Sequence, residues 1–443
     1  MRRHRTILRT NSQRNPEQGI IIVLVAVVML FVVGAMAALS IDVATIYTAR
    51  SEAQLAADGA ALAAARVLAN SGATSDPNSL TDSLMANAWT LAQAVALQVA
   101  EQNQVGGAKL TAAQITLTGP GGTSTNPTVK VSVQVTNLPT FFARILGTRF
   151  LTVAASATAE AYNPSGANAQ TGTTIPVAPL CVKPWLLPNM DPRDLTGATN
   201  IFSATSGAIT APSGLLGWTT PPAPPPNPPT RLKLVCNPPN TTNNGDCSTL
   251  PAPKVWQYYP GDPASFPPPT QALPACVPAL TTAYEQSVAG CIQTPIACNS
   301  NVNIDTSNYG NARNLETRNA VNCLTHAAAN RGDQVDVADA PSPPFQFQAG
   351  DDNPIPGLAG SDVMVSDSLV TVPVFDSSGG ATPTVTIVGF VQLFLSPQGT
   401  AVPFSGHMRT TVINLAGCGS GSVGQQPILG NGASPVAVRL ISQ

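Results

Sequence analysis

The chain has 443 residues, of which only 10% are charged, while 42 are proline and 35 are glycine. This composition is unlike that of an ordinary cytosolic enzyme and suits an envelope or secreted protein rich in strands and loops. The formal net charge is −2, yet residues 1–18 hold five arginines against one glutamate. Because this tail has no aromatic residue for base stacking and no basic folded face follows it, we exclude nucleic acid as a partner.

The next segment, residues 20–41, contains no charged side chain. A helix of this length spans ~33 Å, which matches the hydrocarbon core of a bilayer, so we predict a single transmembrane helix. The arginine-rich tail, residues 1–19, predicts a cytoplasmic N-terminus, with the chain beyond Asp42 outside the cytoplasm. We place the Asp42 carboxylate at the far interface, in contact with water. The string "AMAAL" leaves a cleaved signal peptide open as the alternative.

Residues 43–68 are rich in alanine, contain no proline and have Gly59 as their one glycine. Alanine is the best helix former, so we predict that the transmembrane helix continues into this segment as one rod, which "NSGATSDPNS" ends. Arg50, Gln54 and Asp58 recur at four-residue steps and form a polar stripe. Within the span, the small residues Gly34, Ala35, Ala37 and Ala38 favour close helix packing in lipid, or simply reflect how common alanine is in membrane helices.

The segment "GIIIVLVAVVMLFVVGAMAALSIDVATIYTARSEAQLAADGAALAAA" resembles the start of TadG-like proteins of the Flp (tight adherence, Tad) pilus-assembly system. The positions that carry the resemblance are Gly19, Asp42, Tyr47, Arg50, Gln54, Ala56, Ala57, Asp58, Ala60 and Ala61. Pilins cut by a prepilin peptidase carry a glutamate five residues after the cleaved glycine. Counting from Ile20, that position is Leu24. We therefore expect an uncleaved anchor.

The following residues predict a small α+β module that ends near Tyr162. Residues 79–104 have apolar side chains near helical spacing, which indicates a second helix. The strings "QITLTG", "VKVSVQVTN" and "FLTVAASATAEAY" alternate as strands do. Between the last two, "PTFFARILG" predicts a short helix with Pro139 in its first turn. "LPTFFARILGTRFLTVAASATAEA" again resembles TadG-like chains.

A polar, small-residue linker, residues 163–178, leads to a second region, 179–443. We predict helices at 279–288 and 312–329 and strands at 368–375, 384–395, 407–415 and 436–441. "TTPPAPPPNPPT" is read as a rigid surface loop or as a recognition ligand. The region holds all eight cysteines, which suggest disulfides in an oxidising compartment without revealing their pairing: Cys181, Cys236, Cys247, Cys276, Cys291, Cys298, Cys323 and Cys418.

A search for catalytic or metal-binding residues yields no convergent set. Cys323 and His326 form a lone C-x-x-H with no partner pair for zinc, so we interpret them as half of a cystine beside a surface histidine. His407 could act as a catalytic base only beside a nucleophile, and the sequence contains no G-x-S-x-G nucleophile elbow. The acidic residues from Asp333 to Asp339, and Asp351 with Asp352, lack EF-hand spacing and are interpreted as solvated loops. We therefore expect no enzymatic activity and no cofactor or metal.

The fold class that we predict is α+β: a transmembrane helix that continues into an alanine-rich helix, a small α+β module over 42–162, and a β-rich, disulfide-containing domain. The resemblance implies a single-pass component of Tad/Flp-type pilus assembly in the inner membrane, with its C-terminal region periplasmic or extracellular. Its partners would be the membrane, other pilus-assembly proteins and a second copy of itself. The alternatives are an adhesin that uses a Tad-type anchor and a periplasmic hydrolase.

Overall fold

A computed structural model describes residues 16–76, 83–165, 175–211, 214–218, 232–235, 252–273, 275–307, 311–326, 332–335, 342–396, 408–418, 426–430 and 434–442. The N-terminal elements are α1 (Pro16–Asn70), η1 (Ala73–Ser75), α2 (Ser83–Glu101), β1 (Gln104–Val105), β2 (Ala108–Lys109), η2 (Ala112–Gln114), β3 (Ile115–Gly122), β4 (Pro127–Pro139), η3 (Ala143–Leu146) and β5 (Phe150–Tyr162). The structure is α+β, as predicted, with a long N-terminal apolar helix and several sheets.

The distal elements follow residue 175. They are β6 (Val177–Ala178), β7 (Trp185–Pro188), β8 (Lys233–Leu234), β9 (Gln257–Pro260), α3 (Ala283–Ala289), β10 (Asn301–Asn303), α4 (Asn311–Leu324), β11 (Gln334–Val335), β12 (Phe347–Gln348), β13 (Asp362–Val363), β14 (Leu369–Phe375), β15 (Thr384–Leu395), β16 (Thr410–Gly417), β17 (Ile428–Leu429) and β18 (Ala437–Ser442).

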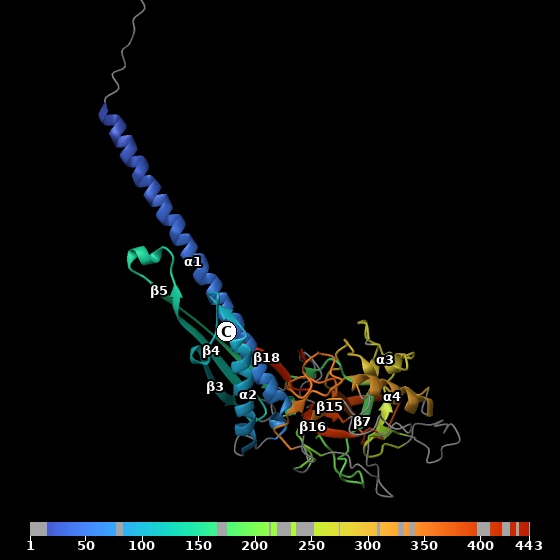
Figure 1. The fold of residues 1–443 in the computed structure, drawn as a ribbon. Helices are drawn as coiled ribbons and strands as arrows, with labels where there is room; N and C mark the ends of the chain where they lie inside the picture. The colour runs from blue at the N-terminus through green and yellow to red at the C-terminus, as the bar shows by residue number, and fades with distance from the viewer. Residues whose placement is uncertain are drawn as a thin grey trace, which may run out of the picture.

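Helix α1 is one unbroken helix of 55 residues, which confirms the predicted rod. Its first half projects away from the rest of the protein, and its second half packs on the N-terminal sheet (Figure 1). Alanine dominates the packed half, and Ala53, Ala57, Ala60 and Ala64 are fully buried. Small side chains let the helix approach the sheet and α2 closely.

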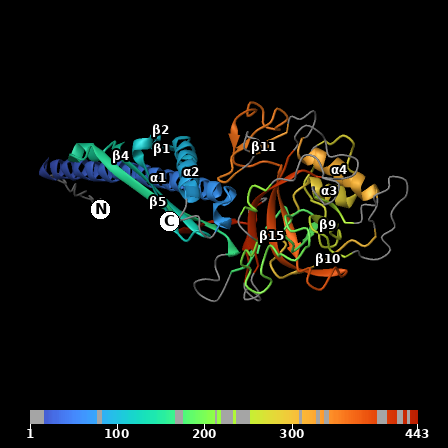
Figure 2. The same cartoon turned by 90° about the horizontal axis from the view of Figure 1, so that it is seen from below.

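Helix α2 confirms the second predicted helix, although residues 79–82 of that prediction lie outside the described residues. Its buried stripe consists of Ala88, Ala92, Ala96 and Ala100, one turn apart. The helix packs alongside α1, and Figure 2 shows the two side by side. The larger Leu91, Val95 and Val99, which suggested the helix, are half-exposed beside this alanine stripe.

The N-terminal sheet is antiparallel, in the order β18-β5-β4-β3. On β4, Val129, Val131 and Val133 are fully buried against α1, as the alternating sequence predicts. The edge strand β18 comes from the end of the chain, where Val438 pairs with Ala161. The last strand predicted for the distal region therefore forms, but it completes the sheet of the first module. Residue 443 lies beyond the described range.

The prediction for the β4–β5 connection needs one correction. Pro139 is the last residue of β4 and pairs with Phe150, so it does not lie in the first turn of the short helix. That helix, η3, is a 3-10 turn that begins at Ala143. Its position is set by a contact with α1, described below.

The distal region is built on a seven-stranded mixed sheet, in the order β10-β15-β14-β7-β9-β8, with β16 paired to β15. The long hairpin of β14 and β15 is buried almost throughout, with α3 and α4 packed together beside the sheet (Figure 2). Strand β15 has the predicted bounds. Strands β14, β16 and β18 and helices α3 and α4 form at the predicted places, with ends that differ by a few residues. His407, residues 327–329 and the proline-rich tract lie outside the described residues.

Disulfides among the described residues join Cys181 to Cys291, Cys276 to Cys323 and Cys298 to Cys418. These bonds close long loops, with a sequence separation of 120 residues for Cys298–Cys418. Cys236 and Cys247 lie outside the described residues. The predicted use of cysteines in disulfides is thus confirmed for these six.

The end of α1 joins the distal region through a buried polar cluster. Asn163, fully buried, donates to the carbonyl oxygens of Thr74 (3.1 Å) and Leu415 (2.8 Å). Leu415 N donates to Ser75 Oγ at 2.8 Å, and Asn414 donates to Ala69 O at 2.7 Å. We name these six residues the junction cluster; it ties the rod to strand β16 of the distal sheet.

Candidate membrane anchor and interaction surfaces

The first half of α1 is an apolar cylinder with no protein around it. Thirteen of its large apolar side chains from Ile20 to Val33 are between 46% and 74% exposed. Of the described residues, only those of α1 form a helix long and apolar enough to cross a membrane. Exposed apolar surface of this extent is not stable in water, so the segment is suited to a lipid bilayer.

Asp42 lies directly after the apolar segment and contacts the connection between β4 and β5. Its carboxylate accepts hydrogen bonds from the backbone N–H groups of Phe141 (2.8 Å), Phe142 (3.0 Å) and Ala143 (2.6 Å). Burial by itself would raise the pKa of Asp42, but these three hydrogen bonds outweigh it and lower the pKa below its ordinary value. Asp42 therefore stays ionised and caps the start of η3.

This contact corrects the expectation that Asp42 lies in water at the interface. The side chain is only 3% exposed, because residues 140–142 close over it. Backbone N–H groups take the place of water around the carboxylate. They stabilise the buried charge as the N–H groups at a helix N-terminus do. Asp42 is thus a tether between α1 and the tip of the β4–β5 hairpin.

The remaining Tad-type motif positions fall into two groups. Ala56, Ala57, Ala60 and Ala61 are fully buried between α1, α2 and the sheet. Gln54 and Asp58 of the predicted polar stripe contact each other at 2.7 Å, and Gln54 also donates to Ser156 O on β5. Gly19 lies within α1.

Tyr47, Arg50 and Leu55, also on the packed half of α1, are exposed. Tyr47 is 68% exposed and Leu55 is 66% exposed, and their eight-residue spacing places them about 80° apart around the helix axis. These two large, exposed side chains lie on a helix that is otherwise packed through alanine, so their apolar area is available for a contact. We name the surface formed by these three residues the open rod face.

The residues considered for metal chemistry have structural contacts. Cys323 is bonded to Cys276, which confirms its interpretation as half of a cystine. His326 lies beside it and contacts Asp367 at 3.1 Å. Among the residues that the structure describes, no three or more His, Cys, Asp or Glu side chains are placed to hold a metal ion.

The interpretation of Asp333 as part of a solvated loop was wrong. Its buried carboxylate accepts hydrogen bonds from Gly350 N, Asn353 Nδ2 and Ser366 Oγ. It thus ties β11 to the segments that flank β12 and β13. Asp351 is exposed, as expected, and Asp336 and Asp339 lie outside the described residues.

Sequence reasoning missed the groove that lies between the rod and the distal region. The groove encloses about 550 Å³ between α1, α2 and residues 345–365. Its walls include Leu91 and Val95 from α2 and Phe347 from β12. Arg66 of α1 lines it too, and burial lowers the pKa of this guanidinium. The half-exposed apolar residues of α2 indicated an apolar surface on this helix. The pattern of one helix does not show which segment of the chain lies opposite that surface.

Comparison with known proteins gives one result. Residues 19–67 match the family model described as putative Flp pilus-assembly TadE/G-like. No curated protein and no solved structure matches the chain. The chain therefore carries a Tad-like domain, and that domain covers the apolar half of α1, the Asp42 tether and the alanine-packed half almost to its end.

Proposed function

We propose that this protein is a non-enzymatic, membrane-anchored component of Tad/Flp-type pilus assembly, which acts by helix packing and protein–protein contacts. The observation that carries the proposal is that the Tad-like match coincides with one continuous helix, exposed and apolar in its first half and alanine-packed in its second. The first half anchors the chain in the inner membrane. The second half carries the folded region.

The orientation follows from two features. Arginines precede the apolar segment, which favours a cytoplasmic N-terminus. Three disulfides among the described residues follow it, and such bonds persist in an oxidising compartment. Both features support a single-pass topology with the folded region in the periplasm or outside the cell.

The open rod face is the surface we assign to assembly partners or to a second copy of the chain. Tyr47 and Leu55 offer apolar area near the membrane surface, and Arg50, three residues after Tyr47, supplies a charge that selects an acidic partner. The domain boundaries that we propose remain 42–162 for the rod and its module and 179–443 for the distal domain, with β18 contributed to the first.

The test is deletion of the gene followed by complementation. We expect the deletion to abolish piliation, scored by electron microscopy, and wild-type protein to restore it. Tyr47→Asp with Leu55→Asp should restore it poorly, while Leu195→Asp, at a residue 57% exposed in the distal region, should restore it fully. Normal piliation in the deletion strain overturns the proposal. If adherence alone is lost, the adhesin alternative replaces it.

A further inference from the structure

The tip of the β4–β5 hairpin carries exposed aromatic and cationic side chains that the fold itself does not use. Phe141 is 61% exposed, Phe142 is 39% exposed and Phe150 is 58% exposed. Arg144 and Arg149 lie among them and are also exposed. Residues 140–150 contain no acidic residue. An exposed cluster of three phenylalanines has a cost in water, and it indicates a surface that is covered in the assembled state.

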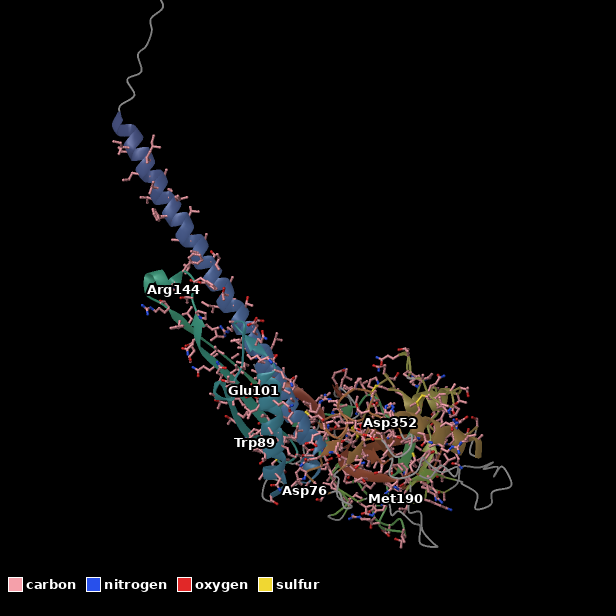
Figure 3. The ribbon with its side chains drawn as sticks, in the orientation of Figure 1. Asp76, Trp89, Glu101, Arg144, Met190 and Asp352 are labelled. Carbon is pink, nitrogen blue, oxygen red and sulfur yellow. A yellow bond between two sulfur atoms is a disulfide. The ribbon has the colours of Figure 1, made fainter. Side chains whose placement is uncertain are left out.

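The position of the tip indicates what covers it. The Asp42 carboxylate binds the backbone of residues 141–143, and Asp42 directly follows the apolar segment 20–41. The tip therefore lies level with the end of the apolar half of α1, and Figures 1 and 3 show it beside α1 there, with Arg144 at the tip. The distal region lies at the other end of the rod, ~42 Å further along α1 from Asp42 to Asn70 at ~1.5 Å per residue.

We propose that residues 140–150 form a second membrane contact, which lies in the headgroup region of the phospholipid bilayer beside the point where α1 leaves it. The inference rests on the proposed membrane anchorage of residues 20–41. It gives residues 140–150 a binding partner, which the proposed role in pilus assembly does not. The occupant is the bilayer itself, because the tip is continuous with the surface that the bilayer already covers.

The chemistry of the tip suits that location. Phenylalanine side chains enter the boundary between headgroups and acyl chains, while arginines bind lipid phosphates. Among the described residues, neither Arg144 nor Arg149 forms an ion pair with an acid, so both guanidinium groups face outward. The one carboxylate at the tip, that of Asp42, is occupied by backbone donors and does not compete for them.

The mechanical consequence is a two-point attachment. A single helix can tilt and rotate in a bilayer, whereas a helix with a hairpin fixed to it at the surface has a preferred tilt and rotation. Because the sheet lies on one side of α1, contact between the tip and the bilayer also fixes the rotation of α1 about its own axis. The open rod face would then have a defined direction relative to the membrane plane, which a lateral assembly contact requires.

The experiment uses the full chain in lipid nanodiscs that contain phosphatidylglycerol and phosphatidylcholine. A benzophenone amino acid replaces one exposed residue at a time: Phe141 or Phe150 at the tip, Phe31 in the apolar segment (74% exposed) and Leu195 in the distal region (57% exposed). After irradiation, mass spectrometry detects lipid bound to the labelled peptide. We expect lipid adducts at 31, 141 and 150 and none at 195.

The outcomes separate the two proposals. Adducts at 31 without adducts at 141 or 150 overturn the second contact and leave the anchor intact. No adduct at 31 overturns the anchorage and the proposed function together. Equal adducts at 141 and 195 show unspecific contact, which also overturns the inference.

A second measurement tests the arginines. Arg144→Gln with Arg149→Gln should lower the adduct yield at 141 several-fold in anionic nanodiscs and much less in pure phosphatidylcholine. The matched control, Lys109→Gln, removes an exposed charge on β2, away from the tip, and should leave the yield unchanged. The same yield for the double variant and wild type in anionic nanodiscs overturns the assignment of these arginines to lipid phosphates.

Discussion

The Asp42 carboxylate lies 2.6 Å from the backbone nitrogen of Ala143, a residue 101 positions further along the chain. This contact links the end of the apolar half of α1 to the tip of the β4–β5 hairpin. It also sets the start of η3, because the short helix begins where its free N–H groups face the carboxylate. One acidic residue thus fixes the tip of the sheet beside the end of the apolar half of α1 and forms the start of η3.

We predict that Asp42→Asn loosens the hairpin tip without unfolding the protein. The amide keeps the shape but loses the charge and one of the two acceptor oxygens, so fewer of the three N–H groups remain bonded. Hydrogen exchange at residues 141–143 should become faster, with the distal sheet unchanged. Asp194→Asn is the matched control, because Asp194 accepts from the backbone of Thr196 and Thr199 in a distal loop. Unchanged exchange at the tip in Asp42→Asn would contradict the tether.

We predict that enlarging the alanine packing of α1 destabilises the N-terminal module. Ala57 and Ala60 are fully buried, so Ala57→Leu or Ala60→Leu forces extra volume into a close-packed contact. The free energy of unfolding should fall by about 1–3 kcal/mol, measured in detergent by denaturant titration. Leu55→Ala, on the open rod face, should change it by less than about 0.5 kcal/mol. Equal effects at the two sites would show that the buried assignment is wrong.

Local sequence patterns were sufficient for the long elements. Strand-like sequence strings predicted Phe150–Tyr162 and Thr384–Leu395 with the observed bounds, and alanine content predicted the continuous rod. These elements carry their signal within a few neighbouring residues. Two-residue strands such as β11 and β12 carry none, because they form only where another segment supplies their partners.

The contacts that build the candidate site are long-range, and the sequence does not encode them locally. The Asp42 tether, the pairing of β18 with β5 and the junction cluster join segments separated by about 100 to 345 residues. The family resemblance singled out Asp42 as a motif residue. Its physical role could not be predicted, because the sequence does not show where the tip of the β4–β5 hairpin lies relative to α1. The disulfide pairing was unpredictable for the same reason.

We predict that Asn163→Ala weakens the connection between the rod and the distal region. The substitution leaves the buried carbonyl oxygens of Thr74 and Leu415 without one of their donors, at a cost of about 1–3 kcal/mol. Thermal unfolding should occur earlier, and hydrogen exchange should increase at residues 73–75 and 414–417. Asn301→Ala serves as the control, since its exposed side chain accepts one hydrogen bond from Thr386. A variant that unfolds like wild type would show that the junction cluster adds nothing to stability.

We predict that the contact between His326 and Asp367 makes the distal region more stable in mild acid than at alkaline pH. The hydrogen bond to Asp367, at 3.1 Å, raises the pKa of His326 in spite of its partial burial, and Asp333 and Asp352 add to the effect. A histidine whose pKa is raised in the folded state contributes its full stabilisation of the fold below the unfolded-state pKa of ~6.5. This contribution is lost as the pH rises through the folded-state pKa.

The measurement is the melting temperature of wild type and His326→Gln across that pH range. The difference should be largest below pH ~6.5 and should disappear at alkaline pH. Because Asp367 is more than half exposed, solvent screens the pair, and we expect no more than ~1 kcal/mol. Asp367→Asn should reproduce the same pH dependence, since it removes the other partner. A difference that is constant with pH would mean that His326 contributes by packing against the Cys276–Cys323 disulfide and not by its charge.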